Sequence, residues 1–371
     1  MKFVVSSTLL SQNLQTVSKV IIAKNAMPIR ENILFEIVGK QLTLTASDED
    51  NTIKAQLEVN SADGDFSFTV PARHLIEIMG KFPEMPLTFD VNDLTKIQLI
   101  SENGKYQLVG TSADEYPQMK ALTDTASFTM PAETLFRAVS KTIFAAADNE
   151  LRPIMNGVCF VLSNDNLVCA ATDSHQLVRF TNTVAKGQDA TFVLPKKPAA
   201  ILKNVLPKEK GNVEVTFDEN SACFTLSSYT IVCRLIDGKY PNFNAVIPKD
   251  NPNKLTIDKS SFMSAINRVA VCSNQASHLI KLDIKANEMI LSAQDYDFST
   301  FATETITCQY EGTPMAIGLK APFLLDILNN IDSSDVSLEL SDPSRAVLIL
   351  PFEDAEDEEI LMLLMPMTLG D

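Results

Sequence analysis

One segment of the chain combines residue types that could perform acid–base chemistry. The run Ala171-Thr-Asp-Ser-His175 places a carboxylate and hydroxyls beside one of only 3 histidines in the chain. A hydrolase could use Asp173 and His175 as an acid–base pair that activates a nucleophile. Neighbouring residues of a strand or tight turn point in different directions, however, so adjacency alone does not make a catalytic triad. A binding role for this run is favoured, and a hydrolase is kept as an alternative.

Other motifs of enzymes and metalloproteins are missing from the sequence. The 12 glycines form neither common type of phosphate-binding loop, and no Gly-x-Ser-x-Gly occurs. No His and Cys residues have zinc spacing, and the acidic run at 353–359 lacks the periodicity and the Gly of an EF-hand. We therefore expect no metal, no cofactor and no enzymatic activity, and we interpret the acidic run as a solvated loop.

The pattern of elements that must position these residues is repeated three times along the chain. Each copy opens a strand-then-helix pattern with an apolar residue, at Phe3, Phe128 and Leu255. Each copy also contains an alternating strand that ends in an acid, at Asp48, Asp173 and Asp295. A long-period repeat is typical of one supersecondary unit used several times. The sequence therefore predicts three domains, which are residues 1–125, 126–251 and 252–371.

Hydrophobic periodicity predicts two helices in each repeat. In the first repeat, Leu10, Leu14 and Val17 fall on one helical face, and Pro71 suits the start of a second helix. The predicted helices are 8–24, 71–81, 131–147, 195–206, 258–271 and 320–331. Strands of the first repeat are expected at 2–6, 33–38, 41–47, 52–59, 65–70, 87–91, 96–101 and 105–111. The predicted fold class is α+β, with two helices packed on a mostly antiparallel sheet of about eight strands in each repeat.

The charge of the chain is unevenly distributed. A net charge of −16 argues at first against a nucleic-acid partner. The six predicted helices nevertheless hold 12 basic and only 4 acidic residues. Because Lys and Arg are also good helix formers, this distribution alone is a weak indication. It is compatible with a protein that presents basic helices to a polyanion and an acidic surface elsewhere.

Cysteine usage and hydropathy indicate a cellular location. The six cysteines are scattered and contain no Cys-x-x-Cys, which is typical of buried, reduced thiols. Apolar runs are too short to span a bilayer, and the N-terminal run soon turns polar, unlike a secretory signal. We therefore expect a cytoplasmic protein.

The C-terminal run Ile360-Leu-Met-Leu-Leu-Met-Pro-Met367 is unusually apolar for a chain end. Its alternation predicts a last strand, although Pro366 has no amide hydrogen with which to continue a ladder. The run fits either an ordinary core strand or an adaptable apolar surface that captures a peptide.

The order and spacing of several short motifs resemble one known family. These motifs are Leu151-Arg-Pro-Ile-Met-Asn-Gly-Val158, Ala171-Thr-Asp-Ser-His175, Asp237-Gly-Lys-Tyr-Pro241, Val246-Ile-Pro248 and Met365-Pro-Met367. Together with the threefold repeat, they resemble the bacterial DNA polymerase III beta subunits, the sliding clamps, over essentially the whole chain. The resemblance implies the DNA clamp fold and a head-to-tail homodimer. Two chains of three domains would close into a ring around double-stranded DNA, with helices lining the hole.

This resemblance also implies a function. The ring would be a polymerase processivity factor, held on DNA by topology and attracted to phosphates without reading sequence. The DNA polymerase III alpha subunit, the clamp loader and repair proteins would dock through short linear motifs. These motifs would be extended, hydrophobic peptides with a Gln and a Leu/Phe end. An open scaffold of three β-rich repeats, with no ring and no retention on DNA, is a further alternative.

Position by position, the resemblance assigns three groups of residues. DNA contacts would be Lys24, Asn149 and Lys197, with Arg73, Lys81, Arg137, Lys141, Arg152 and Lys196 as further candidates. The partner-peptide pocket would be lined by Met155, Thr172, Ser174, His175, Gln176, Leu177, Pro241, Val246, Leu363, Leu364, Met365, Pro366 and Met367. The dimer interface would pair Phe82, Tyr106 and Leu108 with Val271, Cys272 and Phe298. The chain departs from the family at Ser174, where Gly is common, and at Gln176 and Ala245, where Arg is common.

Overall fold

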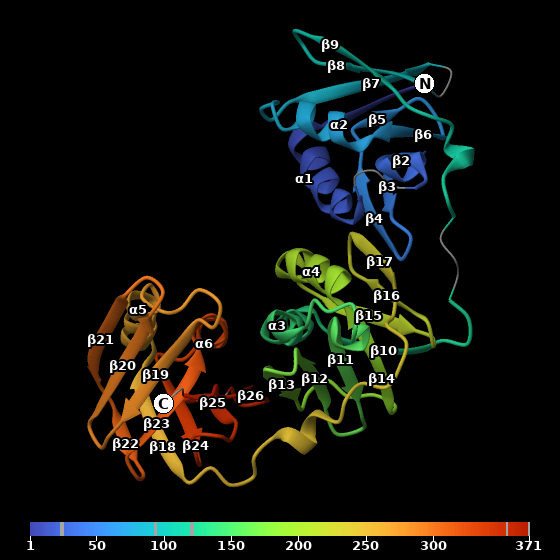
Figure 1. The fold of residues 1–371 in the computed structure, drawn as a ribbon. Coiled ribbons are helices and arrows are strands. Elements are labelled where there is room, and N and C mark those ends of the chain that lie inside the picture. Colours follow the sequence, from blue (N-terminus) through green and yellow to red (C-terminus); the bar gives the residue numbers. More distant parts are fainter. Residues whose placement is uncertain (23–25, 93–94, 119–121, 354, 370–371) are drawn as a thin grey trace. The chain divides into compact units, whose positions relative to one another are not determined.

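The structure, a computed structural model, describes residues 1–22, 26–92, 95–118, 122–353 and 355–369 (Figure 1). The chain forms two compact units, each built from two stretches of sequence. The first unit contains Met1–Phe136 and Lys197–Leu235, and the second contains Arg137–Lys196 and Ile236–Asp371. The division runs through two helices of the second predicted repeat, α3 (Ala132–Thr142) and α4 (Lys196–Val205).

The predicted helices are present, and each is shorter than expected. Besides α3 and α4, they are α1 (Ser7–Val17), α2 (Ala72–Met79), α5 (Lys259–Ala270) and α6 (Ala321–Asn329). Three of them tighten into 3₁₀ turns at Ser18–Val20, Ile143–Ala145 and Leu206–Lys208, which shortens the α-helical part. The side chains of Ser6 and Asp258 cap α1 and α5 by accepting the amides of Leu9 and Ser261. Within the described residues, no helix is long and apolar enough to cross a membrane.

Strands of the first repeat lie within two residues of their predicted bounds. They are β1 (Lys2–Ser6), β2 (Asn32–Val38), β3 (Gln41–Ser47), β4 (Asn51–Glu58), β6 (Phe66–Pro71), β7 (Pro86–Asn92), β8 (Lys96–Ile100) and β9 (Lys105–Val109). A two-residue strand, β5 (Ser61–Ala62), was not predicted. The α+β class and the antiparallel pairing are confirmed, since every strand pair in the described chain is antiparallel.

The expectation of one sheet of about eight strands in each repeat is wrong. In the first unit, the first repeat divides between two sheets, one of which has the order β5-β1-β7-β8-β9. The other has the order β10-β15-β16-β17-β4-β3-β2-β6, so it continues into strands of the second repeat. These added strands are β10 (Ala126–Pro131), β15 (Asn212–Phe217), β16 (Ser221–Thr225) and β17 (Tyr229–Arg234). Pairing of β17 with β4 joins the repeats, because it satisfies backbone groups that would otherwise form an open edge.

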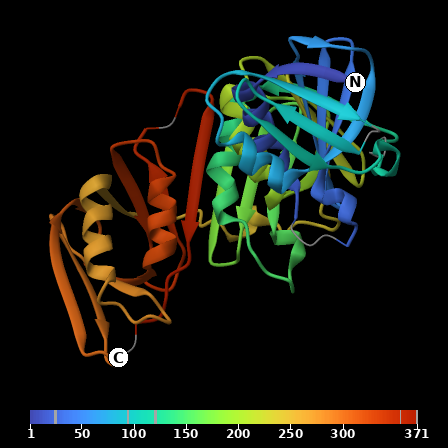
Figure 2. The ribbon, with the colours of Figure 1, turned by 90° about the horizontal axis from the view of Figure 1, so that it is seen from above.

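The second unit is built in the same way. Its larger sheet has the order β14-β11-β12-β13-β26-β25-β24-β18-β22, so β13 of the second repeat pairs with β26 of the third. The bounds are β11 (Gly157–Leu162), β12 (Leu167–Thr172), β13 (Gln176–Asn182), β14 (Ala190–Pro195), β18 (Asn253–Asp258), β22 (Gln309–Glu311), β24 (Asp335–Leu340), β25 (Val347–Pro351) and β26 (Glu358–Leu364). The smaller sheet contains β21 (Thr300–Thr307), β20 (Glu288–Asp295), β19 (Leu279–Ile284) and β23 (Met315–Lys320). Helices α5 and α6 lie side by side (Figure 2).

Aromatic rings hold the two sheets of the first repeat together. Phe3 of β1 stacks on Phe89 of β7 with 4.8 Å between ring centroids. Phe35 of β2 lies 5.0 Å from Phe68 of β6 and 6.1 Å from Phe89. Because these rings are fully buried and come from both sheets, they form the core of this repeat.

The acid at the end of the alternating strand has the same role in all three repeats. One Asp48 oxygen accepts the amides of Asp50 and Asn51, at 2.8 and 2.6 Å. Asp173 accepts the amides two and three residues later, both at 2.8 Å, and Asp295 does so at 2.8 and 3.2 Å. A carboxylate that bonds the following backbone in this way closes an Asx turn. The repeated acid is therefore explained by a hairpin loop and requires no shared chemistry.

Gly110, just after β9, lies against the backbone of Thr69 in β6 and allows a test of this close approach. A Cβ atom at Gly110 would lie 1.8 Å from the Thr69 carbonyl oxygen, so any side chain must displace backbone. We expect Gly110→Ala to lower the free energy of unfolding by about 3 kcal/mol, measured by chemical denaturation. Gly211→Ala is the matched control, because its nearest neighbour, a Glu209 side-chain oxygen, is 3.7 Å away. Equal effects of the two substitutions would contradict the close approach at Gly110.

Candidate functional site

The loop between β12 and β13 is fixed by its own hydrogen bonds. The Thr172 hydroxyl donates to the Gln176 carbonyl at 2.6 Å and accepts the Ser174 amide at 3.1 Å. The Thr172 amide donates to the Tyr240 hydroxyl at 3.1 Å, and burial raises the pKa of that hydroxyl well above its usual value. These contacts hold the loop in one conformation and leave Ser174 and His175 exposed.

Asp173 and His175 do not form an acid–base pair. The Asp173 carboxylate accepts the amides of His175 and Gln176 and, at 3.3 Å, the Gln176 side-chain amide. The His175 ring instead stacks on Phe323, with 6.0 Å between centroids. Catalysis by a triad needs the carboxylate to orient the imidazole. No hydrogen bond in the described part of the chain does this, so the geometry disfavours the hydrolase.

Ser174 has the backbone conformation of a glycine. Its φ is 79°, in the left-handed region where a β-carbon is strained. A glycine would adopt this conformation without strain. The serine hydroxyl of this chain accepts a hydrogen bond from Arg152 Nη1 at 3.0 Å and lies 3.6 Å from the Met155 sulfur.

Beside this loop, apolar side chains from four segments gather on one face of the larger sheet. Leu177 of β13 lies opposite Leu363 of β26, and cross-strand partners share a face. We define the outer apolar cluster as the buried residues Leu177, Ala346, Leu348, Leu361 and Leu363, with the partly exposed Phe243, Ile247 and Leu350 packed on them. Phe243 also packs on Tyr240, which anchors Thr172. The cluster and the loop thus form one continuous surface.

Two residues of the expected pocket lie on the other face. Gln176 pairs with Leu364 one position along the strands, and successive side chains alternate between faces. Both are almost fully buried, at 3% and 0% exposed. Their side chains belong to the core side of the sheet, so the proposed surface omits them.

The C-terminal residues extend the surface. The Met365 amide donates to the His175 carbonyl at 2.8 Å, and the Met367 amide donates to the Gly318 carbonyl at 2.8 Å. The Met365 side chain is 40% exposed, and Pro366 interrupts the ladder as its missing amide hydrogen predicts. Of the other expected residues, Met155 is buried, Pro241 is half-buried and Val246 is exposed.

Sequence reasoning did not assign Phe243, Ile247 or Ala346 to the site. Phe243 and Ile247 lie four positions apart in one segment, whereas Ala346 comes from a distant one, so only the fold brings Ala346 to them. One signal was available for Phe243. This aromatic residue lies two positions after Pro241, the last residue of a motif already singled out.

One expected DNA contact, Lys24, lies outside the described residues. The other expected contacts fall into two classes, which are exposed side chains and side chains that are buried or half-buried and paired with a carboxylate. Exposed members are Arg73, Lys81, Asn149 and Arg152, although Arg73 pairs with Glu77 on its own helix. Lys196 is half-buried and pairs with Asp148 at 2.5 Å.

Three other cations are themselves buried or half-buried, and each pairs with a carboxylate. Lys141 is 8% exposed and donates to Asp332 at 2.6 Å and to the Asn330 carbonyl at 2.7 Å. Burial opposes the charge of Arg137, but its bonds to Glu358 and Asp332 outweigh burial and raise its pKa. Lys197 donates at 2.6 Å both to Asp48 and to the Val20 carbonyl. These cations stabilise the chain itself, which leaves less of their charge for DNA.

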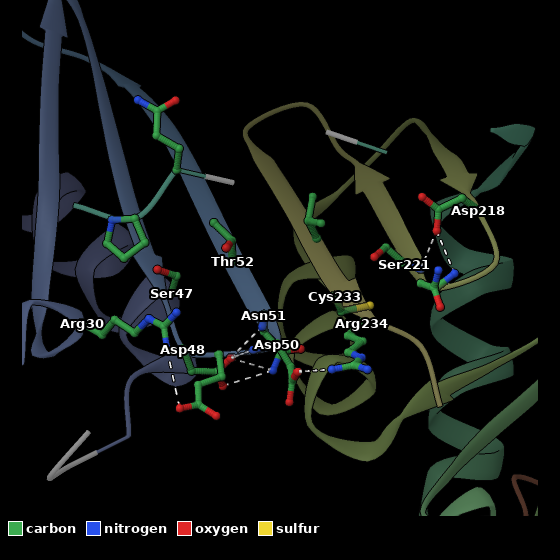
Figure 3. A pocket seen from close by; sticks show the side chains of 15 residues that line it. Arg30, Ser47, Asp48, Asp50, Asn51, Thr52, Asp218, Ser221, Cys233 and Arg234 are labelled. Atoms are coloured by element: carbon green, nitrogen blue, oxygen red, sulfur yellow. Dashed lines mark hydrogen bonds and ion pairs between the residues drawn. The ribbon is translucent and has the colours of Figure 1, made fainter. Parts of the chain in front are cut away.

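Asp48 also lines a hollow of about 580 Å³ where β4 meets β17 (Figure 3). On its walls, Asp50 lies 3.8 Å from Arg234, and Glu49 lies 3.8 Å from Arg30. Nowhere in the described chain do three or more His, Cys, Asp or Glu side chains group to hold a metal. The charges of the hollow are largely paired with one another, and we assign it no metal.

Among the edge strands of the four described sheets, two lie near the expected interface residues. β9 is the last strand of the five-stranded sheet, and β21 is the last strand of the four-stranded sheet. Near β9, the rings of Phe82 and Tyr106 meet edge to face at 5.5 Å, whereas Leu108 is buried and faces the core. Near β21, Val271 and Phe298 are 82% and 66% exposed. The Cys272 carbonyl accepts the Thr300 hydroxyl at 3.3 Å. Open edges with exposed apolar residues favour association.

Comparison with known proteins matches three successive parts of the chain to one family. Models of the DNA polymerase III beta subunit match at residues 1–120 (N-terminal domain), 129–242 (central domain) and 244–368 (C-terminal domain). The beta sliding clamp of Pseudomonas putida is 26% identical over 100% of both chains. Crystal structures of sliding clamps from Bartonella birtlesii and Pseudomonas aeruginosa, both bound to griselimycin, have TM-scores of 0.93. They are 27% and 25% identical to this chain, over 100% of each.

Proposed function

Because the chain belongs to the DNA polymerase III beta-subunit family, we propose that it is a sliding clamp that keeps the polymerase on duplex DNA. The observation that carries the proposal is that all three family models match in order and together span most of the chain. The family predicted from the motifs is thereby confirmed. We propose the domains 1–125, 126–251 and 252–371, a purely mechanical, non-enzymatic role without cofactor, and a cytoplasmic location beside chromosomal DNA.

The proposed ring is a head-to-tail homodimer. Its support is the pair of open edges, β9 and β21, which belong to different sheets and carry exposed aromatic or aliphatic neighbours. Pairing β9 of one chain with β21 of its partner uses a different surface on each chain. Such head-to-tail contacts give a closed ring only if the rotation that relates one chain to the next adds up to a full turn. Phe82, Tyr106, Val271, Cys272 and Phe298 are the proposed interface residues. Leu108 supports them from the core.

The proposed DNA surface uses the exposed Lys81, Asn149 and Arg152, with Lys24 and Arg73. The pair of Arg73 with Glu77 is solvent-exposed, so it neutralises little of the arginine's charge. Diffuse attraction of phosphates requires charge that carboxylates have not already neutralised. Arg137, Lys141 and Lys197 are therefore weaker candidates than position matching implies, and Lys196 is intermediate.

The proposed partner site is the outer apolar cluster with the loop at 172–176 and the residues at 365–367. Phe243, Ile247 and Met365 would supply apolar contact, and the fixed loop would set the register of an extended peptide. The polymerase alpha subunit, the clamp loader and repair proteins are the proposed partners.

Retention on circular DNA tests the ring. We expect labelled protein, loaded on nicked circular DNA by its clamp loader with ATP, to stay bound through gel filtration and to dissociate once the circle is linearised. The physical reason is that a closed ring can leave only over a DNA end. Equal retention on both forms would mean direct binding. No retention on either, with a loader proven active on a related clamp, would favour the open scaffold.

A further inference from the structure

The hollow where β4 meets β17 has the same backbone plan as the proposed partner site of the second unit. At the hollow, the Arg234 amide donates to the Asp50 carbonyl at 2.8 Å, and at the partner site the Met365 amide donates to the His175 carbonyl at the same distance. Both loops are closed by the repeated acid of the alternating strand. Position 50 of the first unit therefore corresponds to position 175 of the second, and position 234 corresponds to position 365.

A tyrosine in each unit supports this correspondence. Both tyrosines are buried, and each precedes a proline. The Ser47 hydroxyl donates to the Tyr116 hydroxyl at 3.4 Å, and in the second unit the Thr172 amide donates to the Tyr240 hydroxyl. The two loops are thus held by equivalent neighbours, and their side chains can be compared position by position.

The side chains at equivalent positions differ in kind. Both sites are entered by a 3₁₀ turn that begins with Pro-Ile, and both have the same register between the paired strands. The partner site has apolar or aromatic side chains at these positions, whereas most of those in the hollow are polar or charged. The pairs, with the residue of the hollow first, are Arg30 and Met155, Asp50 and His175, Thr52 and Leu177, Val232 and Leu363, and Arg234 and Met365.

A buried side chain of the hollow has an atom without a hydrogen-bond partner (Figure 3). Asn51 is only 7% exposed, and its amide nitrogen donates to both oxygens of Asp48 at 3.1 Å. Its Oδ1 has no partner among the described residues, and neither has the Nε of Arg30. A buried polar atom without a partner costs free energy. A bound segment that offers both a donor and an acceptor would recover this cost.

The charges of the hollow favour a cation. Four carboxylates and two guanidiniums line it, and the ammonium of Lys197 pairs with one of the carboxylates, so negative groups outnumber positive ones. Both guanidiniums lie 3.8 Å from a carboxylate, which is longer than a hydrogen bond. Such loose pairs contribute little, so a bound cation can replace them. The carboxylates are Asp48, Glu49, Asp50 and Asp218, and the guanidiniums are Arg30 and Arg234.

We propose that this hollow is a second docking site, which binds an extended segment that carries lysine side chains. The lysine ammonium would pair with Glu49 and Asp50, and the backbone of the segment would supply a donor to Asn51 and an acceptor to Arg30. The inference goes beyond the proposed tethering of the polymerase. It gives each chain two docking sites with the same backbone plan, of which one prefers an apolar segment and the other a basic one.

The test uses a fluorescent hexapeptide, Ser-Lys-Ser-Lys-Ser-Lys, and its counterpart with glutamine in place of each lysine. Dissociation constants are measured by fluorescence anisotropy. We expect the lysine peptide alone to bind, and Glu49→Gln combined with Asp50→Asn to weaken its binding about fivefold. The matched control is Glu214→Gln combined with Asp165→Asn, which removes the same charge from two exposed carboxylates outside the hollow. We expect the control to change the affinity less than about twofold, because distant exposed charges are screened by salt.

A competition experiment locates the bound peptide. An excess of an unlabelled peptide that begins with Gln and ends in Leu-Phe should leave the lysine peptide bound. Displacement would mean that the lysine peptide occupies the partner site, which overturns the inference.

The remaining outcomes also decide the question. If both double variants weaken binding equally, the net charge of the chain attracts the peptide and the hollow is not a site. The same conclusion follows if the lysine peptide does not bind or binds no better than the glutamine peptide. Binding of the apolar peptide is measured directly on the same samples, so a failure of the proposed partner site is recognised separately. The comparison of the two double variants would then still test the hollow. Thermal unfolding of each variant verifies that the fold is intact.

Discussion

Asp48→Ala will lower the free energy of unfolding by about 3 kcal/mol, because it leaves a half-buried lysine without its counter-charge. The Asp48 side chain is only 5% exposed, and its carboxylate accepts the Lys197 ammonium at 2.6 Å. The same carboxylate also accepts two backbone amides of its own turn and the Asn51 side chain. Chemical denaturation of the purified protein measures the loss.

Asp218→Ala is the matched control. Asp218 closes an equivalent turn by accepting the amides of Asn220 and Ser221, and no lysine in the described part of the chain pairs with it. We expect it to lose about 1 kcal/mol, the contribution of a turn alone. If the two substitutions are equally destabilising, the Lys197 contact adds nothing and the lysine is free for DNA.

The effect of Asp48 should depend on pH in a defined direction. Burial would raise the pKa of Asp48, but the hydrogen bonds from Lys197 and from the turn outweigh it and hold the pKa below its ordinary value. A depressed folded-state pKa contributes stability above the ordinary pKa of Asp, about 3.9, and loses it as pH falls through the folded value. The stability difference between the unmodified protein and Asp48→Ala should therefore be full at neutral pH and shrink in acid.

Local patterns predicted the elements well because they depend on nearby residues. The face formed by Leu10, Leu14 and Val17 is sufficient to locate α1, and alternation locates β3 at the predicted residues. Sheet order was not predictable in this way. The pairing of β4 with β17 and of β13 with β26 joins strands of different repeats, and no local signal encodes such partners.

The candidate site shows the same limit. Position matching with the family selected the loop at 172–176, and it treated Leu363 and Leu364 alike. Strand alternation separates them, since Leu363 joins the outer apolar cluster and Leu364 lies in the core. Likewise, the type of Lys141 suggests a DNA contact, whereas its bond to Asp332 is visible only in three dimensions. Residue type predicts which interactions a side chain can make, and the fold determines which partner it contacts.

Removal of residues 365–371 will weaken binding of an apolar partner peptide by roughly thirtyfold, or about 2 kcal/mol, because two methionines that would contact it are lost. Met365 and Met367 are fixed beside the loop by backbone bonds to His175 and Gly318. The truncation leaves β26 complete, since that strand ends at Leu364. Fluorescence anisotropy with a peptide that begins with Gln and ends in Leu-Phe measures the change.

The point of truncation decides whether this experiment is informative. A cut before Leu363 would remove two residues that are 2% and 0% exposed, so any loss of binding would follow from a damaged sheet. Removal of residues 370–371 alone is the control for the chain end, and we expect it to leave affinity unchanged. If the longer truncation unfolds at nearly the same temperature as the full chain and still binds the peptide as tightly, residues 365–367 are not part of the partner site. The site would then be confined to Phe243, Ile247 and the outer apolar cluster beneath them.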